Sequence, residues 1–217
     1  RFDKQNKDMF WVDEVQYVDV LLKHQNKGGK DFDPISIAFI SDIHMGSKYF
    51  LEETWDKMMH WLNTAPLAKN IKYLVLSGDT VDGAGVYPDQ NKNLSIQNVY
   101  DQYQYCASKL DELPDHITPI ILPGNHDAVR PAEPQPVLEH QIQQKFNSAI
   151  HVGNPCRISL NGIDVLSYHG KGMDDIIPRI EEVTYEDSVI GMKHMLKKRH
   201  LAPIWGERNA LSPEEHD

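Results

Sequence analysis

The sequence predicts a layered α/β fold in which mixed sheets are flanked by helices. Three observations lead to this class. Short apolar, β-branched runs alternate along the chain with segments whose apolar residues recur at helical spacing. The pair Asn161-Gly162, a strong hairpin signal, joins two further runs of alternating polarity. The 217 residues, 40% of them hydrophobic, are enough to bury one substantial core.

The first 33 residues stand apart from this pattern. Residues 10–22 (FWVDEVQYVDVLL) mix apolar and acidic residues and could form a strand pair or the edge of a preceding domain. Residues 23–34 (KHQNKGGKDFDP) are polar and contain a Gly pair and a Pro, which is typical of a linker. We therefore expect residues 1–33 to be the end of a preceding domain plus linker, and residues 34–217 to form the α/β domain.

From residue 34 onward, strands alternate with helices. Nearly continuous apolar runs, of the kind found in strands buried on both faces, occur at residues 35–40, 73–77 and 117–122. Apolar residues at helical spacing predict helices at residues 51–62, 96–112, 137–146 and 187–198. Residues 156–170 (CRISLNGIDVLSYHG) contain the predicted hairpin. Strands that alternate with helices, followed by a hairpin, favour layers of sheet and helix.

Charge and cysteine content narrow the function. The net charge is −10 at pH 7, whereas a module that grips nucleic acid by charge alone is usually basic. The acidity suits a carboxylate-rich site for divalent cations, because bound ions invert the local charge. Cys106 and Cys156 form no CxxC pair, which fits a reducing cytoplasm better than a zinc knuckle or a disulfide framework. No apolar stretch is long enough to cross a bilayer and no signal peptide is apparent, so we expect a cytoplasmic protein with no membrane role.

Polar side chains follow the predicted strands at the points where the strands end. These residues are Asp42 and His44 in SDIHMG, Asp79 and Asp82 in SGDTVDG, Asn125, His126 and Asp127 in PGNHD, and His169 in SYHG. The carboxyl ends of strands in open α/β sheets converge on a ligand crevice, so we expect these side chains to meet. Oxygen donors and imidazoles without cysteine suit Mn²⁺, Mg²⁺, Fe or Zn²⁺.

The spacing within each set suggests what its members do. Asp42 and His44 project from one short turn and can reach the same ion. Asp79 has two carboxylate oxygens and could bridge two ions about 3.5–4 Å apart, the spacing used in two-metal hydrolysis. Asn125 offers a neutral oxygen to the second ion. His126, the next residue, would point the other way and stay free for proton transfer or for contacting a scissile phosphate.

Each motif taken alone also has a simpler explanation. A single DxH is common, and Asp82 fits a helper or turn former better than a ligand. His169 could be a satisfied loop histidine, while Asp127 could fix the tautomer of the neighbouring His126. The joint pattern is different, because motifs that each follow a predicted strand rarely coincide by chance. The sequence therefore predicts a site for divalent cations.

The motif set resembles that of the calcineurin-like metallophosphoesterases. The matching motifs are DxH at 42–44, GDxxDG at 78–83, GNHD at 124–127 and HG at 169–170. Longer stretches, above all AVRPAEPQP after GNHD, are similar to the small subunits of archaeal family D DNA polymerases. The resemblance covers about residues 34–217, and generic phosphatases do not share the stretch after GNHD.

This resemblance implies a layered metallophosphoesterase fold and a metal-dependent 3′–5′ exonuclease that proofreads beside a large polymerising subunit. The implied substrate is the single-stranded 3′ end of a primer, and the implied location is the nucleoid. Two divalent ions are implied, with Mn²⁺ expected first and Mg²⁺, Fe or Zn²⁺ as alternatives. Residues 1 to about 30 are similar to the end of the oligonucleotide-binding barrel that precedes the phosphoesterase domain in that family.

Site residues follow from the same resemblance, motif by motif. One ion takes Asp42, His44 and Asp79, and the other takes Asp79, Asn125 and His169. His126 is implied as the catalytic histidine, with Asp127 beside it. Residues that could contact substrate or support the site are Asp82, Arg130 and His200.

One departure concerns the C-terminal motif. The family pattern closes with Gly-His-x-His, which supplies one more ligand to each metal, and this sequence contains no such motif. His216 lies between Glu215 and Asp217 and does not match. We therefore expect the phosphoesterase domain to be truncated at its C-terminus.

Two other functions remain open at this point. One is a purely structural polymerase subunit, an alternative that the intact DxH, GD, GNHD and HG sets oppose. The other is a stand-alone metallophosphatase or cyclic-nucleotide phosphodiesterase, which would share the metal motifs but not RPAEPQP at 130–136.

Overall fold

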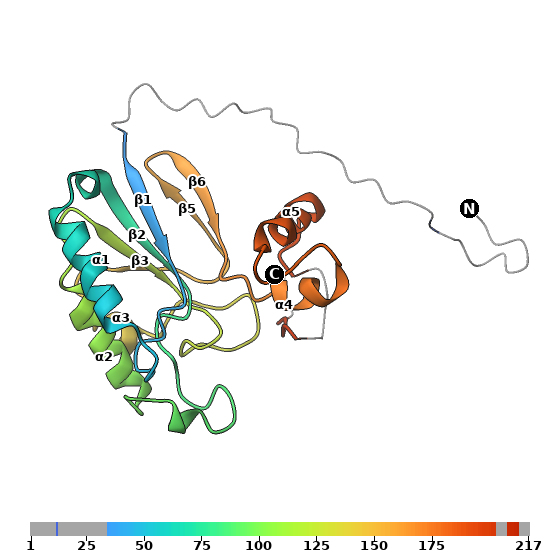
Figure 1. Ribbon diagram of the computed structural model, residues 1–217, viewed down its shortest axis with the longest axis horizontal. Helices are drawn as coiled ribbons and strands as arrows, with labels where there is room; N and C mark the ends of the chain where they lie inside the picture. Colours follow the sequence, from blue (N-terminus) through green and yellow to red (C-terminus); the bar gives the residue numbers. More distant parts are fainter. Residues whose placement is uncertain (1–11, 13–33, 203–207, 213–217) are drawn as a thin grey trace, which may run out of the picture.

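Four parallel strands form the central sheet of the computed structural model, which describes residues 12, 34–202 and 208–212 (Figure 1). In spatial order the strands are β1 (Ser36–Ile40), β2 (Ile71–Ser77), β3 (Thr118–Leu122) and β4 (Ile150–His151). Ile40 pairs with Leu76, and Ser77 pairs with Leu122, so β1, β2 and β3 end at nearly the same level. The loops that follow these strands therefore leave the sheet at one edge.

Helices cover one face of this sheet: α1 (Glu52–Thr64), α2 (Val99–Leu110) and the short α3 (His140–Gln143) (Figure 1). The main core lies between them and the sheet, and its members from α1 and β2 include Trp55, Met59, Leu62, Leu74 and Leu76. Asn98 caps α2, because its side-chain oxygen accepts a hydrogen bond from the backbone N–H of Tyr100 at 2.8 Å. Two 3₁₀ helices, η1 (Pro66–Asn70) and η2 (Gln90–Lys92), lie in the connections.

An antiparallel hairpin, β5 (Cys156–Leu160) and β6 (Ile163–Ser167), packs against the opposite face of the sheet. Successive side chains of a strand point to opposite faces, so Val75 of β2 faces the hairpin and contributes to a second core with Leu160. The hairpin turn has φ of 50° at Asn161 and 80° at Gly162, as a two-residue turn of type I′ requires. The result is three layers: helices, parallel sheet and hairpin.

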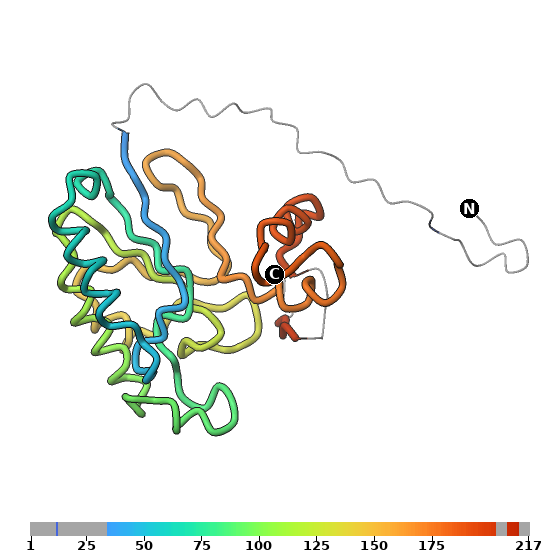
Figure 2. The backbone as a smooth tube through the Cα atoms, viewed as in Figure 1, coloured from blue at the N-terminus to red at the C-terminus, as the bar shows by residue number. Residues whose placement is uncertain are grey.

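The last described elements form a small helical lobe, made of α4 (Met173–Ile176), the 3₁₀ helix η3 (Ile177–Arg179) and α5 (Ser188–Lys198) (Figure 2). This helical lobe has its own core of Ile176, Val183 and Met195. Glu133 joins the lobe to the layers, because its Oε2 accepts hydrogen bonds from Tyr168 Oη at 2.8 Å and from Asn209 Nδ2 at 2.6 Å.

Most of the predicted elements are confirmed. The strands predicted at 35–40, 73–77 and 117–122, the hairpin, and the helices near 51–62, 96–112 and 187–198 are present within a few residues. Of the helix predicted at 137–146, only His140–Gln143 is helical. The expectation of mixed sheets is wrong for the central sheet, where all strand pairs are parallel, and antiparallel pairing of strands is confined to the hairpin within the described residues.

Two expectations concern the ends of the chain and the membrane. The features predicted at residues 10–22 and 23–33 lie outside the described residues, except for Val12. Among the residues that are described, no helix is long and apolar enough to cross a membrane.

Candidate metal centre

The loops after β1 and β2 run side by side beyond the ends of their strands. The backbone N–H groups of Asp42, His44 and Met45 donate to carbonyls of Gly78, Asp79 and Thr80 at 3.0–3.1 Å. His44 and Asp79 also adopt left-handed backbone conformations, with φ of 52° and 50°, and Asp42 has φ of 54°. Such conformations cost on the order of 1–3 kcal/mol each for residues other than glycine and cluster at functional sites. The paired loops hold three candidate ligands in strained positions.

Two glycines allow the candidate ligands to pack closely against the backbone. A Cβ atom at Gly78 would overlap Nδ1 of His169, and one at Gly124 would overlap Oδ1 of Asp79. Gly78 also has φ of 98°, which L side chains rarely adopt. Both glycines therefore allow His169 and Asp79 to approach the backbone and each other, which explains the Gly of the GD and GN pairs.

His169 faces two oxygen atoms. Its Nδ1–H donates to the carbonyl of Ser77 at 3.0 Å, which directs Nε2 toward Asn125 Oδ1 at 3.1 Å and Asp79 Oδ1 at 3.4 Å. A neutral imidazole with this tautomer would present a lone pair to two oxygen acceptors, which is unfavourable unless a cation or a proton lies between them. These donor atoms therefore fit a divalent cation.

The pKa values of His169 and Asp79 are shifted in the directions that favour their charged forms. Burial by itself would lower the pKa of His169, but the hydrogen bond and charge of Asp79 raise it to about 9. For Asp79, burial acts to raise the pKa, and the hydrogen bond and charge of His169 overcome it, so that the pKa is lowered. Both shifts favour the charged forms, so the Asp79 carboxylate and a positive charge at His169 stabilise each other.

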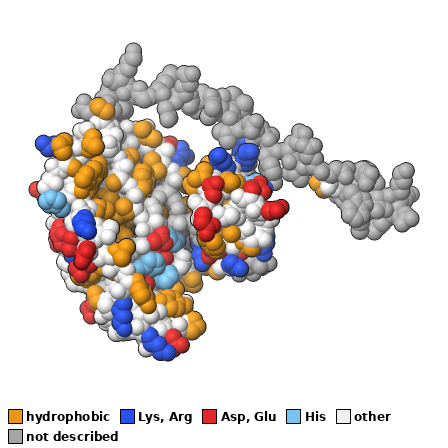
Figure 3. Space-filling model, in the orientation of Figure 1, with side chains coloured by type: hydrophobic (Ala, Val, Ile, Leu, Met, Phe, Trp, Pro, Cys, Tyr) orange, Lys and Arg blue, Asp and Glu red, His pale blue; other side chains and the backbone are white. Residues whose placement is uncertain are grey.

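Asp79 lies between two histidines. Its Oδ1 is 3.4 Å from Nε2 of His169, while its Oδ2 is 3.7 Å from Nε2 of His44. Asp42 Oδ1 is 4.0 Å from the same nitrogen of His44, and Asp42 also belongs with Asp79 and His169 to a set of donor atoms within 4.8 Å of one another. Each oxygen of Asp79 thus faces a different histidine, and Asp42 lies near both. Figure 3 shows histidine and acidic side chains gathered in the middle of this face, next to hydrophobic surface.

Asp82 holds the His44 ring by a hydrogen bond at Nδ1. Its Oδ1 accepts from Nδ1 of His44 at 3.0 Å, and its Oδ2 accepts from Nε2 of Gln90 at 3.1 Å. A carboxylate on Nδ1 fixes the tautomer of a histidine and raises the basicity of Nε2. His44, Asp82 and His126 are also close together. Nδ1 of both histidines is engaged with Asp82: that of His44 contacts the carboxylate at 3.0 Å, and that of His126 contacts the carbonyl at 2.8 Å.

Asp82→Asn is expected to weaken Mn²⁺ binding by about tenfold, because an amide oxygen accepts from Nδ1 of His44 more weakly than a carboxylate and orients the ring less firmly. Isothermal titration calorimetry with Mn²⁺ measures the effect. Asp89→Asn, a change in an exposed carboxylate that pairs with Lys92, is the matched control. Equal affinities in the two variants would show that Asp82 only shapes the turn.

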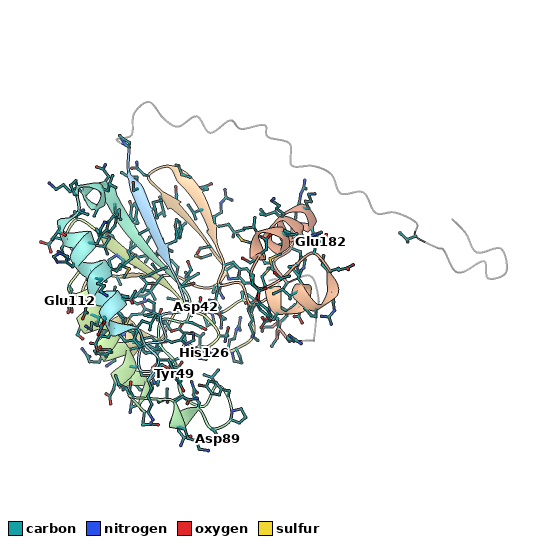
Figure 4. The ribbon with its side chains drawn as sticks, in the orientation of Figure 1. Asp42, Tyr49, Asp89, Glu112, His126 and Glu182 are labelled. Atoms are coloured by element: carbon teal, nitrogen blue, oxygen red, sulfur yellow. The ribbon has the colours of Figure 1, made fainter. Side chains whose placement is uncertain are left out.

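His126 is held by two hydrogen bonds, neither of which involves its Nε2. Its Nδ1–H donates to the carbonyl of Asp82 at 2.8 Å, and its backbone N–H donates to Oδ1 of Asp79 at 2.8 Å. Its ring stands edge-on to His44, with centroids 4.6 Å apart. Figure 4 shows the labelled Asp42 and His126 in the same region, where the strands end. His126 is thus fixed beside the donor sets, with its Nδ1 unable to bind a cation.

The expectation that Asp127 fixes the tautomer of His126 is wrong. The Asp127 side chain is buried and accepts hydrogen bonds from Gly124 N at 2.8 Å, Thr80 N at 3.2 Å and Tyr103 Oη at 2.8 Å. Burial raises the pKa of Asp127 more than these hydrogen bonds lower it. Asp127 therefore ties the loops after β2 and β3 to helix α2.

Arg130 and His200 make hydrogen bonds to the backbone close to them in sequence. The Arg130 guanidinium donates to the carbonyl of Pro134 at 2.7 and 3.1 Å. His200 Nδ1 accepts from the backbone N–H of Ala202 at 3.1 Å, and His200 lines a separate cavity with Glu133. Among the described contacts, none joins either side chain to the donor sets.

Two buried supporting residues were missed from the sequence. Asn154 accepts from the backbone N–H of His169 at 2.9 Å and donates to Oε1 of Gln135 at 2.7 Å. Gln135 in turn donates to the carbonyl of Gly124 at 3.0 Å. The distinctive stretch 130–136 thus braces two ligand-bearing loops. The sequence marks this stretch through its family resemblance, but a Gln between two prolines gives no indication of this supporting role.

Comparisons with known proteins are consistent across the chain. The family of the B subunits of DNA polymerases alpha and epsilon matches residues 37–216. The "DNA polymerase II small subunit" of Archaeoglobus fulgidus is 43% identical over 215 residues, which cover 95% of this chain and 43% of that protein. The corresponding proteins of Methanocaldococcus jannaschii and Pyrococcus abyssi are 43% and 37% identical, over 85% and 97% of this chain and 33% and 36% of theirs. The chain therefore spans less than half the length of these relatives.

Proposed function

Because this chain belongs to the family of alpha and epsilon polymerase B subunits, as an archaeal family D small subunit, we propose that it is a metal-dependent 3′–5′ exonuclease. The expected partner is a large polymerising subunit, and the expected role is removal of misincorporated nucleotides. The observation that carries the proposal is the position of Asp79, whose two oxygens face different histidines. A carboxylate placed in this way suits two-metal phosphodiester hydrolysis.

Two sets of residues would hold the ions. Asp42, His44 and Asp79 form one set, and Asp79, Asn125 and His169 form the other. When bound, two divalent cations would stabilise the charge that develops on the phosphate and lower the pKa of water. Mn²⁺ is the ion we expect first, since oxygen and imidazole donors without thiolates suit it.

His126 would serve the leaving group. Its Nδ1–H is held by the Asp82 carbonyl, so Nε2 is the atom left to face the substrate; in the imidazolium form it would donate a hydrogen bond to the phosphate and its proton to the departing 3′ oxygen, leaving a neutral imidazole. Asp82 would keep His44 and His126 aligned, because its side chain contacts one ring and its carbonyl the other. The net charge of −10 would repel DNA, so the large subunit would have to deliver the primer end.

The test uses the complete two-subunit polymerase and a primer–template with a 3′ mismatch. In the presence of Mn²⁺, the complex should release mononucleotides from the 3′ end, and His44→Ala should lower that release by about a hundredfold or more while polymerisation continues. His194→Ala, a change on α5 where His194 pairs with Glu182, is the control. Release that persists in the His44 variant would place the nuclease in the other subunit and make this chain structural.

A further inference from the structure

A pocket of about 530 Å³ opens beside the donor sets and has two chemically different walls. One wall carries Asp42, His44 and His126, while the other is apolar and aromatic. The aromatic wall includes Tyr49 and Tyr87, whose relative exposures are 74% and 39%. Contiguous exposed apolar surface that is rimmed by polar residues marks ligand-binding grooves, so this wall is a candidate binding surface.

We propose that this pocket binds the base and sugar of the terminal nucleotide, with Tyr49 and Tyr87 as stacking surfaces. The inference rests on the proposed function and adds the subsite that holds the leaving nucleotide. A volume of about 530 Å³ falls in the range of pockets that enclose one small ligand. Aromatic faces bind bases of any sequence by stacking, which suits an enzyme that must accept every terminal base.

The inner part of the aromatic wall is rigid. The Phe50 ring packs against Trp55 with centroids 6.3 Å apart and against Tyr105 at 6.2 Å. Trp55 is buried in the main core, so this part of the wall is anchored to helix α1. Tyr87 lies next to His126, with its ring 6.1 Å from the His126 ring and its hydroxyl accepting from Asn93 at 3.3 Å. In Figure 4, Tyr49 is labelled next to His126, and both line the pocket.

Charge fixes the direction of the bound nucleotide. The carboxylates of Asp42, Asp79 and Asp82 repel phosphate unless cations lie among them, so the phosphodiester belongs at the donor sets and the uncharged base at the aromatic wall. His126 lines the pocket with its ring 4.6 Å from that of His44 and 6.1 Å from that of Tyr87, so it lies between a candidate ligand and an aromatic side chain. With the nucleotide in this orientation, the scissile phosphate lies near Nε2 of His126, the atom that we expect to protonate the departing oxygen.

Entry to such a pocket requires an unpaired base. A terminal base pair must open before its 3′ base can stack on protein, which costs a few kcal/mol and least for a mismatched base. The pocket would therefore favour primer ends whose terminal base is already unpaired, and so help to discriminate mismatched ends from paired ones. Tyr49 and Tyr87 are binding residues in this scheme, since neither faces the reacting phosphate.

The test compares two single-stranded oligonucleotides in the complete two-subunit complex with Mn²⁺, one with a 3′-terminal thymidine and one with a 3′-terminal abasic residue. The wild type should cleave the thymidine end at least about tenfold faster in kcat/KM. Tyr49→Ala and Tyr87→Ala should each remove most of that preference, whereas Tyr49→Phe and Tyr87→Phe should keep it. Tyr185→Ala, an exposed tyrosine on the helical lobe, is the control.

A second readout does not depend on hydrolysis. An oligonucleotide with 2-aminopurine at its 3′ end should lose fluorescence on binding, because the base stacks on tyrosine, and Tyr49→Ala with Tyr87→Ala should restore the signal. Equal cleavage of both ends together with unchanged fluorescence would overturn the pocket assignment and leave the nuclease proposal intact. If no nucleotide is released but fluorescence is lost in a tyrosine-dependent way, the pocket stands and the exonuclease proposal fails.

Discussion

Asp79→Asn in the two-subunit complex is expected to lower Mn²⁺-dependent release of nucleotides by about a thousandfold or more. The carboxylate is 3% exposed and faces His44 and His169 with separate oxygens. Asparagine keeps the shape but offers one neutral oxygen and an amide that repels cations. Because the pKa of Asp79 is lowered, the wild-type side chain is ionised and the substitution removes a full negative charge.

The measurement is nuclease activity at saturating Mn²⁺, accompanied by calorimetric titration of the metal. Circular dichroism and thermal unfolding establish that the variant is folded. Asp115→Asn, a change in an exposed loop before β3, is the matched control. Full activity of Asp79→Asn at saturating metal would remove Asp79 from the mechanism.

His126→Ala is expected to separate turnover from metal binding. Turnover should fall by about 10²–10⁴, the usual contribution of a positioned acid or base. Affinity for Mn²⁺ should stay the same, because Nδ1 of His126 is engaged with the carbonyl of Asp82 and we assign Nε2 to the substrate. His169→Ala should instead weaken Mn²⁺ binding, and lose turnover as a result, since its Nε2 faces Asn125 and Asp79.

Single-turnover kinetics and calorimetry measure the two quantities for both variants. His60→Ala, on the exposed side of α1, controls for the loss of an imidazole. Weaker Mn²⁺ binding in His126→Ala would make His126 a ligand and would require another group to serve the leaving oxygen.

The local sequence was sufficient to predict the strands and to identify the polar residues that follow them. Strands β1, β2 and β3 are nearly continuous apolar runs that end at polar or glycine-containing turns, and their parallel topology brings these ends to one edge. The meeting of Asp42 and Asp79 could therefore be anticipated without knowing any contact, whereas that of His169 also depends on how the hairpin packs on the sheet. Their roles as ligands remain predictions until a metal is measured.

Contacts that depend on direction or on distant segments could not be predicted. Asp127 adjoins His126 in sequence, yet neighbouring side chains in a loop need not face each other, and Asp127 turns into the core toward Tyr103. Asn154 and Gln135 pair across 19 residues, and neither lies in a periodic pattern. The helix expected at 137–146 had a different cause of error, because Leu138, Ile142 and Phe146 are all buried although only four residues there are helical.

The side-by-side course of the loops after β1 and β2 has a consequence for the thermodynamics of metal binding. Because Met45 and Val81 form a bridge beyond the strands, Asp42, His44 and Asp79 sit on a backbone that is ordered by its own hydrogen bonds. The entropy of fixing these ligands is then lost during folding, and an arriving ion need not order them again. Mn²⁺ binding should therefore proceed with little change in backbone amide exchange at residues 42–45 and 78–82. Affinity would depend on charge and donor chemistry, with almost no contribution from loop ordering.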